Sequence, residues 1–209
     1  MVDLDEEILQ AQEKGALTVF VGAGVSCDSP SSLPTVDILA KRIISESGRS
    51  GDLSANGPPD RKLGELKRKF KIPVHTLVRD ITGNATSQPT DTHRNLLRLF
   101  RDPGSVRLVT TNFDRHLTTE ARNKWNDRIE IFNAPALPLG SNFRGLVYLH
   151  GSVDGDPDRL VVTDEDFGRA YLTEGWATRF LLGLFQNQTV LFIGYRHEDT
   201  ILDYLARAL

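Results

Sequence analysis

The chain contains 209 residues, of which 39% are hydrophobic, and this length and composition predict one well-buried domain over residues 1–209. Its 25 basic and 28 acidic residues leave a net charge of −3, which gives no reason to expect nucleic acid or an anionic membrane as a partner. One cysteine rules out an intramolecular disulfide and a multi-cysteine zinc site, and an acidic start without a signal peptide or a long apolar run favours a cytoplasmic protein.

The first part of the chain predicts a short helix, a strand and a loop. Acidic residues 3–7 and the apolar residues after them indicate the helix. The apolar run 17–21 predicts a buried strand that opens directly into Gly22–Gly24. Apolar residues return at helical spacing over 36–44, and because Pro34 is tolerated only near a helix start, several loop residues separate the glycines from this helix.

A helical insertion is predicted over about residues 45–100. Its first part, 45–60, is polar and rich in turn-forming residues, which is typical of a surface loop. Two short helices are expected at 63–70 and 74–81, and a third helix at 93–100.

The second half of the chain alternates between predicted strands and helices. Strands are expected at residues 106–111, 129–132, 146–149, 160–162 and 189–193, and helices at 114–124, 165–172 and 176–185. This alternation predicts an α/β fold with a Rossmann-like, mostly parallel sheet and helices on both faces. A last helical segment, 199–209, has no glycine or proline stop, so we expect the chain to be the N-terminal part of a longer protein.

The step from a buried strand into Gly22, Ala23 and Gly24 predicts a nucleotide-binding loop. Glycines let a pyrophosphate approach backbone N–H groups at the start of a helix. The pattern is incomplete as a dinucleotide fingerprint, because Cys27 stands in place of a third glycine and no second strand with a terminal acid follows. The lysine of a Walker loop is also missing, so a dehydrogenase and a P-loop nucleotidase are both disfavoured.

Polar residues follow four of the predicted strands. They are Gly22–Ser26, Asn112–Asp114, His150–Ser152 and Gly194–Arg196. The carboxyl ends of parallel strands face one crevice, and ligands bind there in doubly wound sheets. The four segments are therefore predicted to form one site.

In this order, Gly22–Ser26, Thr111–Asp114, Leu149–Gly151 and Gly194–Tyr195 resemble the sirtuin superfamily, and the resemblance spans nearly the whole chain. No cysteine follows Cys27, so the zinc module of the deacylase sirtuins is absent, and lysine-peptide recognition is not expected. Segments 160–171 and 194–199 are similar to bacterial sirtuin-like domains that hydrolyse NAD in anti-phage defence. The resemblance therefore implies NAD+ as the substrate and no metal.

Under this resemblance each motif implies a role. Gly22, Ala23, Gly24 and Ser26 are expected at the pyrophosphate, and Gly194 and Tyr195 at the adenosine half. Asp114 is assigned to the nicotinamide side or to holding its loop. Asn112 both donates and accepts hydrogen bonds, so it is expected to orient a ribose hydroxyl and the attacking water. His150 titrates near neutrality when unperturbed and is expected to act as the base.

Simpler explanations stay open for the same residues. Asn112 and Asp114 could cap the following helix, Gly22 and Gly24 could be packing glycines, and His150 could be a hydrogen-bonded structural residue. The remaining histidines show no metal-ligand spacing and are expected at the surface or at helix caps; they are His75, His93, His116 and His197.

The predicted function is therefore an NAD+ glycohydrolase that depletes NAD in anti-phage defence. One alternative is a zinc-free deacylase or ADP-ribosyl transferase, which would need an acceptor. Another is a module that senses NAD or ADP-ribose without turnover. The resemblance further implies a homo-oligomer and a fused or separate sensor domain or protein.

Overall fold

The computed structural model describes residues 5–54 and 57–195. Its helices are α1 (Glu6–Glu13), α2 (Val36–Glu46), α3 (Pro59–Phe70), α4 (Val74–Thr82), α5 (Asp91–Arg98), α6 (His116–Trp125), α7 (Asp164–Gly168) and α8 (Trp176–Asn187). Its strands are β1 (Leu17–Val21), β2 (Arg107–Thr110), β3 (Ile131–Asn133), β4 (Gly145–Tyr148) and β5 (Thr189–Ile193). Two short turns also matter here: the 3₁₀ turn η1 (Ala23–Ser26) and the π-helical turn η7 (Arg169–Thr173). The helix predicted for 199–209 lies outside the described residues.

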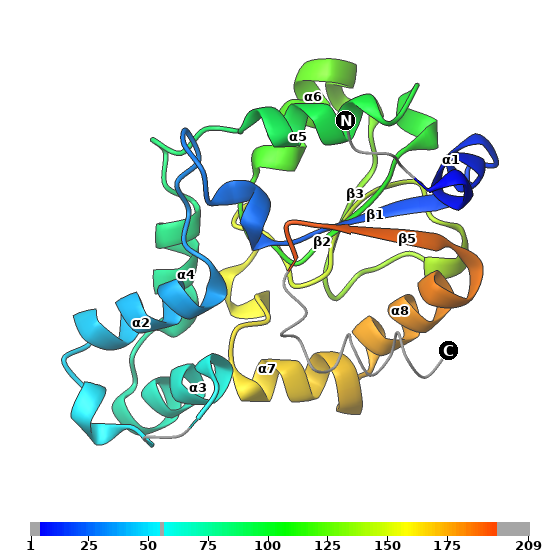
Figure 1. The fold of residues 1–209 in the computed structure, drawn as a ribbon. Helices are drawn as coiled ribbons and strands as arrows, with labels where there is room; N and C mark the ends of the chain where they lie inside the picture. The colour runs from blue at the N-terminus through cyan, green and yellow to red at the C-terminus, as the bar shows by residue number, and fades with distance from the viewer. Residues whose placement is uncertain (1–4, 55–56, 196–209) are drawn as a thin grey trace.

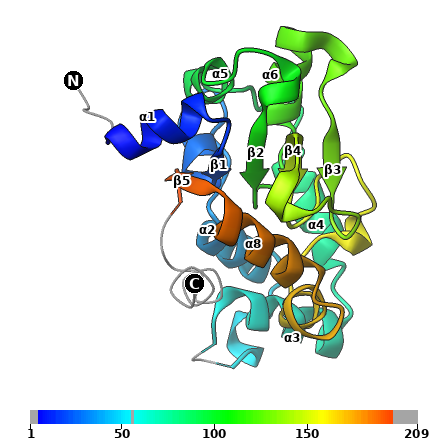
Figure 2. The same ribbon diagram turned by 90° about the vertical axis from the view of Figure 1, so that its right-hand side faces the viewer.

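The strands form one parallel sheet (Figure 1) in the order β3-β4-β2-β1-β5, which can be followed in Figure 2. Val21 of β1 pairs with Thr110 of β2 and with Ile193 of β5, and Thr110 pairs with Tyr148 of β4. Four strands thus end at the same level. The residues that follow them lie along one edge of the sheet.

Helices cover both faces of this sheet, which confirms the predicted α/β fold (Figure 2). Successive strand residues point to opposite faces. Val19 and Leu108 pack with residues of α5 and α6, whereas Phe20 and Val109 pack with residues of α8. The inner strands β1 and β4 are buried along their whole length and mostly apolar, because both of their faces are covered.

The connections that leave β2 and β4 diverge. The chain passes from β2 into α6 on one face, and from β4 through α7 into α8 on the other. Two neighbouring parallel strands with diverging connections leave a crevice at their carboxyl ends, and this switch point is where open α/β sheets bind ligands. Because Thr110 and Tyr148 are in register, Asn112 and His150 each lie two residues beyond the same pair.

Helices α2, α3 and α4 form a separate helical layer beyond the carboxyl ends of the strands (Figure 1). Their apolar residues make a cluster of their own, which includes Ile43, Leu66 and Val78. Phe113, after β2, and Val153, in the loop after β4, belong to the same cluster. The helical layer is thus packed directly on the two loops of the switch point, whereas α5 packs on the sheet.

One predicted strand is wrong. Residues 160–162 run as an extended, buried segment outside the sheet, with the N–H of Val161 donating to the His150 carbonyl at 3.0 Å. Val161 packs in the cluster under α8, whereas Leu160 and Val162 pack in the cluster of the helical layer. The apolar run therefore reflects burial between two clusters rather than a strand ladder, which periodicity alone does not distinguish.

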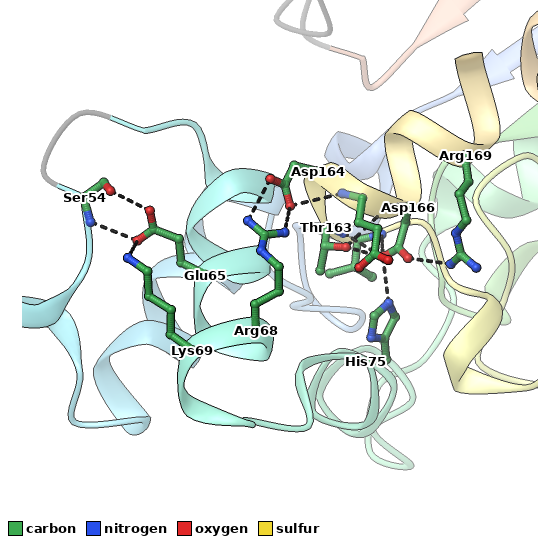
Figure 3. A network of polar contacts seen from close by, with 11 residues as sticks. Ser54, Glu65, Arg68, Lys69, His75, Thr163, Asp164, Asp166 and Arg169 are labelled. Atoms are coloured by element: carbon green, nitrogen blue, oxygen red, sulfur yellow. Dashed lines mark hydrogen bonds and ion pairs between the residues drawn. The ribbon is translucent and has the colours of Figure 1, made fainter. Parts of the chain in front are cut away.

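A polar network joins the helical layer to α7 (Figure 3). Asp166 is 2% exposed, and its Oδ2 accepts hydrogen bonds from His75 Nε2 at 2.7 Å and from the N–H and hydroxyl of Thr163 at 2.9 and 2.8 Å. Its Oδ1 accepts from Arg169 at 2.8 Å. Burial alone would raise the pKa of Asp166, but the bonds from His75 and Thr163 outweigh burial and hold the pKa well below its usual range.

A second contact lies beside this one. Arg68 of α3 donates two hydrogen bonds to Asp164, at 2.7 and 3.0 Å. A Cβ on Gly64 would collide with the Asp164 carboxylate, so glycine at this position lets α3 approach α7 closely. Farther along α3, Glu65 accepts from the Ser54 N–H and hydroxyl (Figure 3).

We expect Asp166→Asn to lower the free energy of unfolding by about 3 kcal/mol at pH 7, because an amide has one acceptor oxygen instead of two and sets its NH2 group against the donors of His75 and Thr163 or against Arg169. A carboxyl group whose pKa is lower in the folded state stabilises the fold above its unfolded pKa of about 4. This stabilisation is lost as the pH falls below that value. The gap between variant and wild type should therefore shrink below about pH 4. Urea unfolding at pH 7 and pH 3.5 measures this, and Asp164→Asn, at a partly exposed pair, is the matched control. An equal effect of both substitutions would contradict the assignment.

Candidate functional site

The glycine loop after β1 is locked to the end of β5. The N–H groups of Gly22 and Gly24 donate to the carbonyls of Ile193 and Gly194, at 2.9 and 2.8 Å. A Cβ on Gly22 or Gly24 would lie 2.6 or 2.8 Å from the Gly194 oxygen. Gly194 itself has φ +64°, and its Cβ would meet Val25. The packing explanation for these glycines therefore holds, and two amides predicted to face a phosphate are already bonded.

The last predicted motif, which contains Gly194 and Tyr195, lies beside the glycine loop. Tyr195 follows Gly194 and packs edge-on against Phe20 of β1, with ring centroids 5.7 Å apart, and against Phe192 of β5 at 5.6 Å. Gly22, Ala23, Gly24 and Gly194 thus lie together, as predicted from their places at strand ends. The loop residues predicted between the glycines and α2 are also present, since α2 begins only at Val36.

Asn112 is held by its amide nitrogen. Its Nδ2 donates to the Gly22 carbonyl at 3.2 Å and to Ser26 Oγ at 3.4 Å, while its backbone N–H donates to Thr110 Oγ1 at 3.0 Å. The carbonyl of Gly22 can only accept, which fixes the nitrogen on that side. The opposite atom, Oδ1, is buried and has no partner within residues 5–54 and 57–195, although the side chain is only 8% exposed. A buried acceptor in this state fits a ligand hydroxyl or N–H.

Ser26 is the centre of the cluster around Asn112. Its Oγ donates to Asp114 Oδ2 at 2.9 Å and lies 3.2 Å from His93 Nε2. His93 is fully buried, and burial lowers its pKa to about 4, against the opposing effect of the Asp114 charge. Its Nδ1 accepts the Thr90 N–H at 3.0 Å, so the neutral ring carries its proton on Nε2 and donates to Ser26. A histidine that donates to the serine does not take its proton, so Ser26, His93 and Asp114 do not form a nucleophilic triad.

Asp114 caps α6. Its Oδ1 accepts the N–H of His116, the first residue of that helix, at 3.0 Å. The predicted capping role is therefore confirmed for Asp114, and its other oxygen serves Ser26. No cap is formed by Asn112, whose side chain points to Gly22 and Ser26.

His150 lies in a second cluster, on the side of α7. It is 5% exposed, and its Nε2 lies 2.9 Å from the hydroxyl of Tyr171. The ring of Phe167 packs edge-on against the imidazole at a centroid distance of 5.3 Å. Two clusters therefore approach the switch point, one carrying Asn112 and the other His150.

The expected surface position is wrong for three of the other histidines, whereas the alternative, a place at a helix cap, is confirmed for His93, whose side chain completes the capping box of α5. His75, His93 and His116 are at most 4% exposed. His116 contacts Ser87 Oγ at 2.8 Å and stacks edge-on with His93, and burial lowers its pKa. One signal for His93 was available, since Thr90 and His93 have capping-box spacing and the box is formed. His197 lies outside the described residues.

Other features of the molecule lie apart from these clusters. A cavity of about 420 Å³ opens near the amino ends of β2, β3 and β4, lined among others by Arg128, Glu130 and Arg144, and none of the predicted site residues lines it. Within the described residues no set of three or more His, Cys, Asp or Glu side chains is arranged to hold a metal. No helix in the same part of the chain is long and apolar enough to cross a membrane.

The fold and the polar strand ends define an α/β domain with a polar switch point between β2 and β4. The SIR2-like domain family matches residues 106–209, the part that contains Asn112 and His150. The chain belongs to the sirtuin-like superfamily, whose SIR2-like domains use NAD+ as a substrate.

A relative is also found in Sinorhizobium fredii (strain NBRC 101917 / NGR234), under the name "uncharacterized protein y4cA". It is 29% identical over 230 aligned positions, which cover 99% of this chain and 18% of that protein. The chain thus spans less than a fifth of the length of this relative.

We expect Gly24→Ala to lower the free energy of unfolding by about 1–3 kcal/mol, because the new Cβ would meet backbone atoms of Gly194. Thermal unfolding without ligand measures the loss. Gly51→Ala, where a Cβ meets nothing within 4 Å, should change stability by less than about 0.5 kcal/mol. A Gly24→Ala protein as stable as wild type would contradict the packing role.

The neutral state of His93 predicts a pH dependence of stability. A lowered histidine pKa means that the unfolded chain binds the proton first, so stability falls as pH drops from about 6.5 to about 4. The expected loss is about 3 kcal/mol by pH 4. Urea unfolding at pH 7 and pH 4.5 should show a steeper loss for wild type than for His93→Asn. Parallel losses in the two proteins would show that His93 is not the group concerned.

Proposed function

We propose that this domain is an NAD+ glycohydrolase that cleaves the bond between nicotinamide and ribose. The observation that carries the proposal is the buried, unpartnered Oδ1 of Asn112 at the switch point of a SIR2-like domain, within the described part of the chain. A ribose hydroxyl or a water molecule would donate to this oxygen. His150 follows the neighbouring strand at the matching register position.

The chemistry asked of these residues is modest. Nicotinamide leaves NAD+ as a neutral molecule when the C1′–N bond breaks and its electron pair goes to nitrogen, so no strong general acid is needed. Positive charge develops on the ribose, and the oxygen of a water molecule then bonds to C1′. In the proposal Asn112 orients the ribose or this water, and His150 accepts the proton that is released.

The proposed binding residues follow from the same geometry. Gly22, Ala23, Gly24 and Ser26 would lie along the pyrophosphate, with Gly194 and Tyr195 toward the adenosine half. Since the Gly22 and Gly24 amides are bonded to the end of β5 and their missing Cβ atoms make room for Gly194, the glycines would serve mainly by fixing the loop against which the ligand lies. Asp114 would act through Ser26 on the nicotinamide side.

Hydrolysis is favoured over peptide deacylation by the missing cysteines, because the zinc module that accompanies peptide recognition in deacylase sirtuins is absent from the sequence. We further propose that the enzyme depletes NAD in the bacterial cytoplasm during anti-phage defence, as a homo-oligomer coupled to a sensor domain or protein. This chain covers only 18% of the S. fredii relative, which supports the proposal that the domain works alongside other domains.

We expect purified protein to release nicotinamide and ADP-ribose from NAD+ without a peptide acceptor, more strongly at high protein concentration. Asn112→Ala and His150→Ala should each lower kcat about 100-fold or more, because one loses the orienting amide and the other the base. Asn95→Ala, at an exposed position of α5, is the matched control and should keep full activity. Products are identified by chromatography, and circular dichroism checks that each variant is folded.

The same assay separates the alternatives. Turnover that requires an acceptor would indicate a deacylase or an ADP-ribosyl transferase. Tight NAD+ binding without turnover at any concentration would indicate a sensing module. Unchanged turnover in folded Asn112→Ala and His150→Ala proteins would overturn the proposed site.

A further inference from the structure

We propose that Tyr171 is a positioning residue for His150: its hydroxyl holds the imidazole in one orientation, and through this contact it sets kcat. The inference rests on the proposed function of His150 and extends it to the segment after α7. Neither the glycine loop nor the other motifs at strand ends include this tyrosine.

The contact between the two side chains is short and protected from water. The Tyr171 hydroxyl lies 2.9 Å from His150 Nε2, and the two residues are 3% and 5% exposed. A water molecule therefore does not easily replace either partner in this hydrogen bond. The hydroxyl can donate to Nε2 or accept from it, so in either tautomer the bond keeps the imidazole in place.

Aromatic packing fixes the rings as well. Phe167 stacks on Tyr171 with an interplanar angle of 16° and a centroid distance of 5.9 Å. The same Phe167 ring meets His150 edge-on at 79°. Three rings thus pack on one another, and the imidazole has little freedom to turn away from the hydroxyl.

The backbone that presents Tyr171 is unusual. Residues Arg169–Thr173 form a π-helical turn directly after α7, a geometry that recurs at functional sites. The hydroxyl of Thr178 in α8 donates to the Tyr171 carbonyl at 2.6 Å. At the other end, the buried Asp166 ties α7 to His75 of the helical layer. Both ends of the segment that carries Phe167 and Tyr171 are therefore anchored.

Replacement of Tyr171 by phenylalanine distinguishes a positioning role from a purely structural one. A tyrosine that only fills space would be replaced by phenylalanine without effect on the histidine, because the ring that packs on Phe167 remains. A positioning residue acts through the hydroxyl, so its removal changes His150 while the packing is kept. Tyr148 offers a matched control: its hydroxyl is also buried and hydrogen-bonded, 2.8 Å from Thr118 Oγ1, and its side chain packs in the cluster under α5 and α6.

The test compares Tyr171→Phe and Tyr148→Phe in the whole chain. In ¹⁵N NMR spectra of histidine-labelled protein, with His150 assigned from the His150→Gln variant, Tyr171→Phe should change the ring-nitrogen shifts of His150, because Nε2 loses its hydrogen-bond partner. Tyr148→Phe should leave them as in wild type. In the NAD+ assay Tyr171→Phe should lower kcat about tenfold or more, with KM changed less than twofold.

Unchanged His150 signals in a folded Tyr171→Phe protein would overturn the inference, and so would a wild-type kcat. The NMR result does not depend on turnover. If wild-type protein shows no NAD+ cleavage but the Tyr171→Phe spectra show the shift at His150, the proposed function fails while the assigned contact stands.

Discussion

The arrangement around Asn112 depends on one buried oxygen, the Oγ of Ser26. It accepts hydrogen bonds from Asn112 and His93 and donates its single proton to Asp114. One hydroxyl has one donor and two lone pairs, so its capacity is filled. Removing it would leave three buried polar groups each short of a partner, at about 1–3 kcal/mol for each group. This one atom thereby bridges the loop after β1, the start of α5 and the loop after β2, in addition to the bond from Asn112 to the Gly22 carbonyl.

The two clusters at the switch point reflect the topology of the sheet. Asn112 is supported from the face of α5 and α6, through His93 and Asp114. His150 is supported from the opposite face, through Phe167 and Tyr171. Because the connections after β2 and β4 leave toward opposite faces, the two side chains reach the crevice from separately packed halves. The helical layer touches both loops, through Phe113 and Val153, and so fixes their separation.

Much of this fold could be predicted from the sequence, because the strands are short apolar runs that end in polar residues. The run 17–21 is buried along its whole length, as expected of a strand covered on both faces. The run 160–162 has the same composition and is not a strand, since its neighbours are two apolar clusters rather than another strand. An apolar run predicts that a segment is buried, but it does not predict whether a neighbouring strand or a side-chain cluster buries it.

The polar part of the site was harder to predict. Positions at strand ends bring Asn112 and His150 to one edge, and this follows from parallel pairing alone. His93 and Tyr171 come from a helix and a π turn whose approach depends on tertiary packing, so no local spacing relates them to Ser26 or to His150. The residues proposed to bind the ligand directly follow strands and can be located from the sequence, whereas the residues that contact them are found only when the fold is assembled.

The charge state of the Asn112 cluster bears on the proposed reaction. With His93 neutral near pH 7, the formal charge among its hydrogen-bonded partners is the carboxylate of Asp114. A protonated His93 would place a cation beside the same hydroxyl and offset that carboxylate. Cleavage of NAD+ moves positive charge from the nicotinamide ring onto the ribose, and electrostatic stabilisation is strongest where water is excluded. In the proposed reaction, a neutral His93 would leave the charge of the Asp114 carboxylate uncompensated within this cluster, which would favour positive charge on a ribose bound beside it.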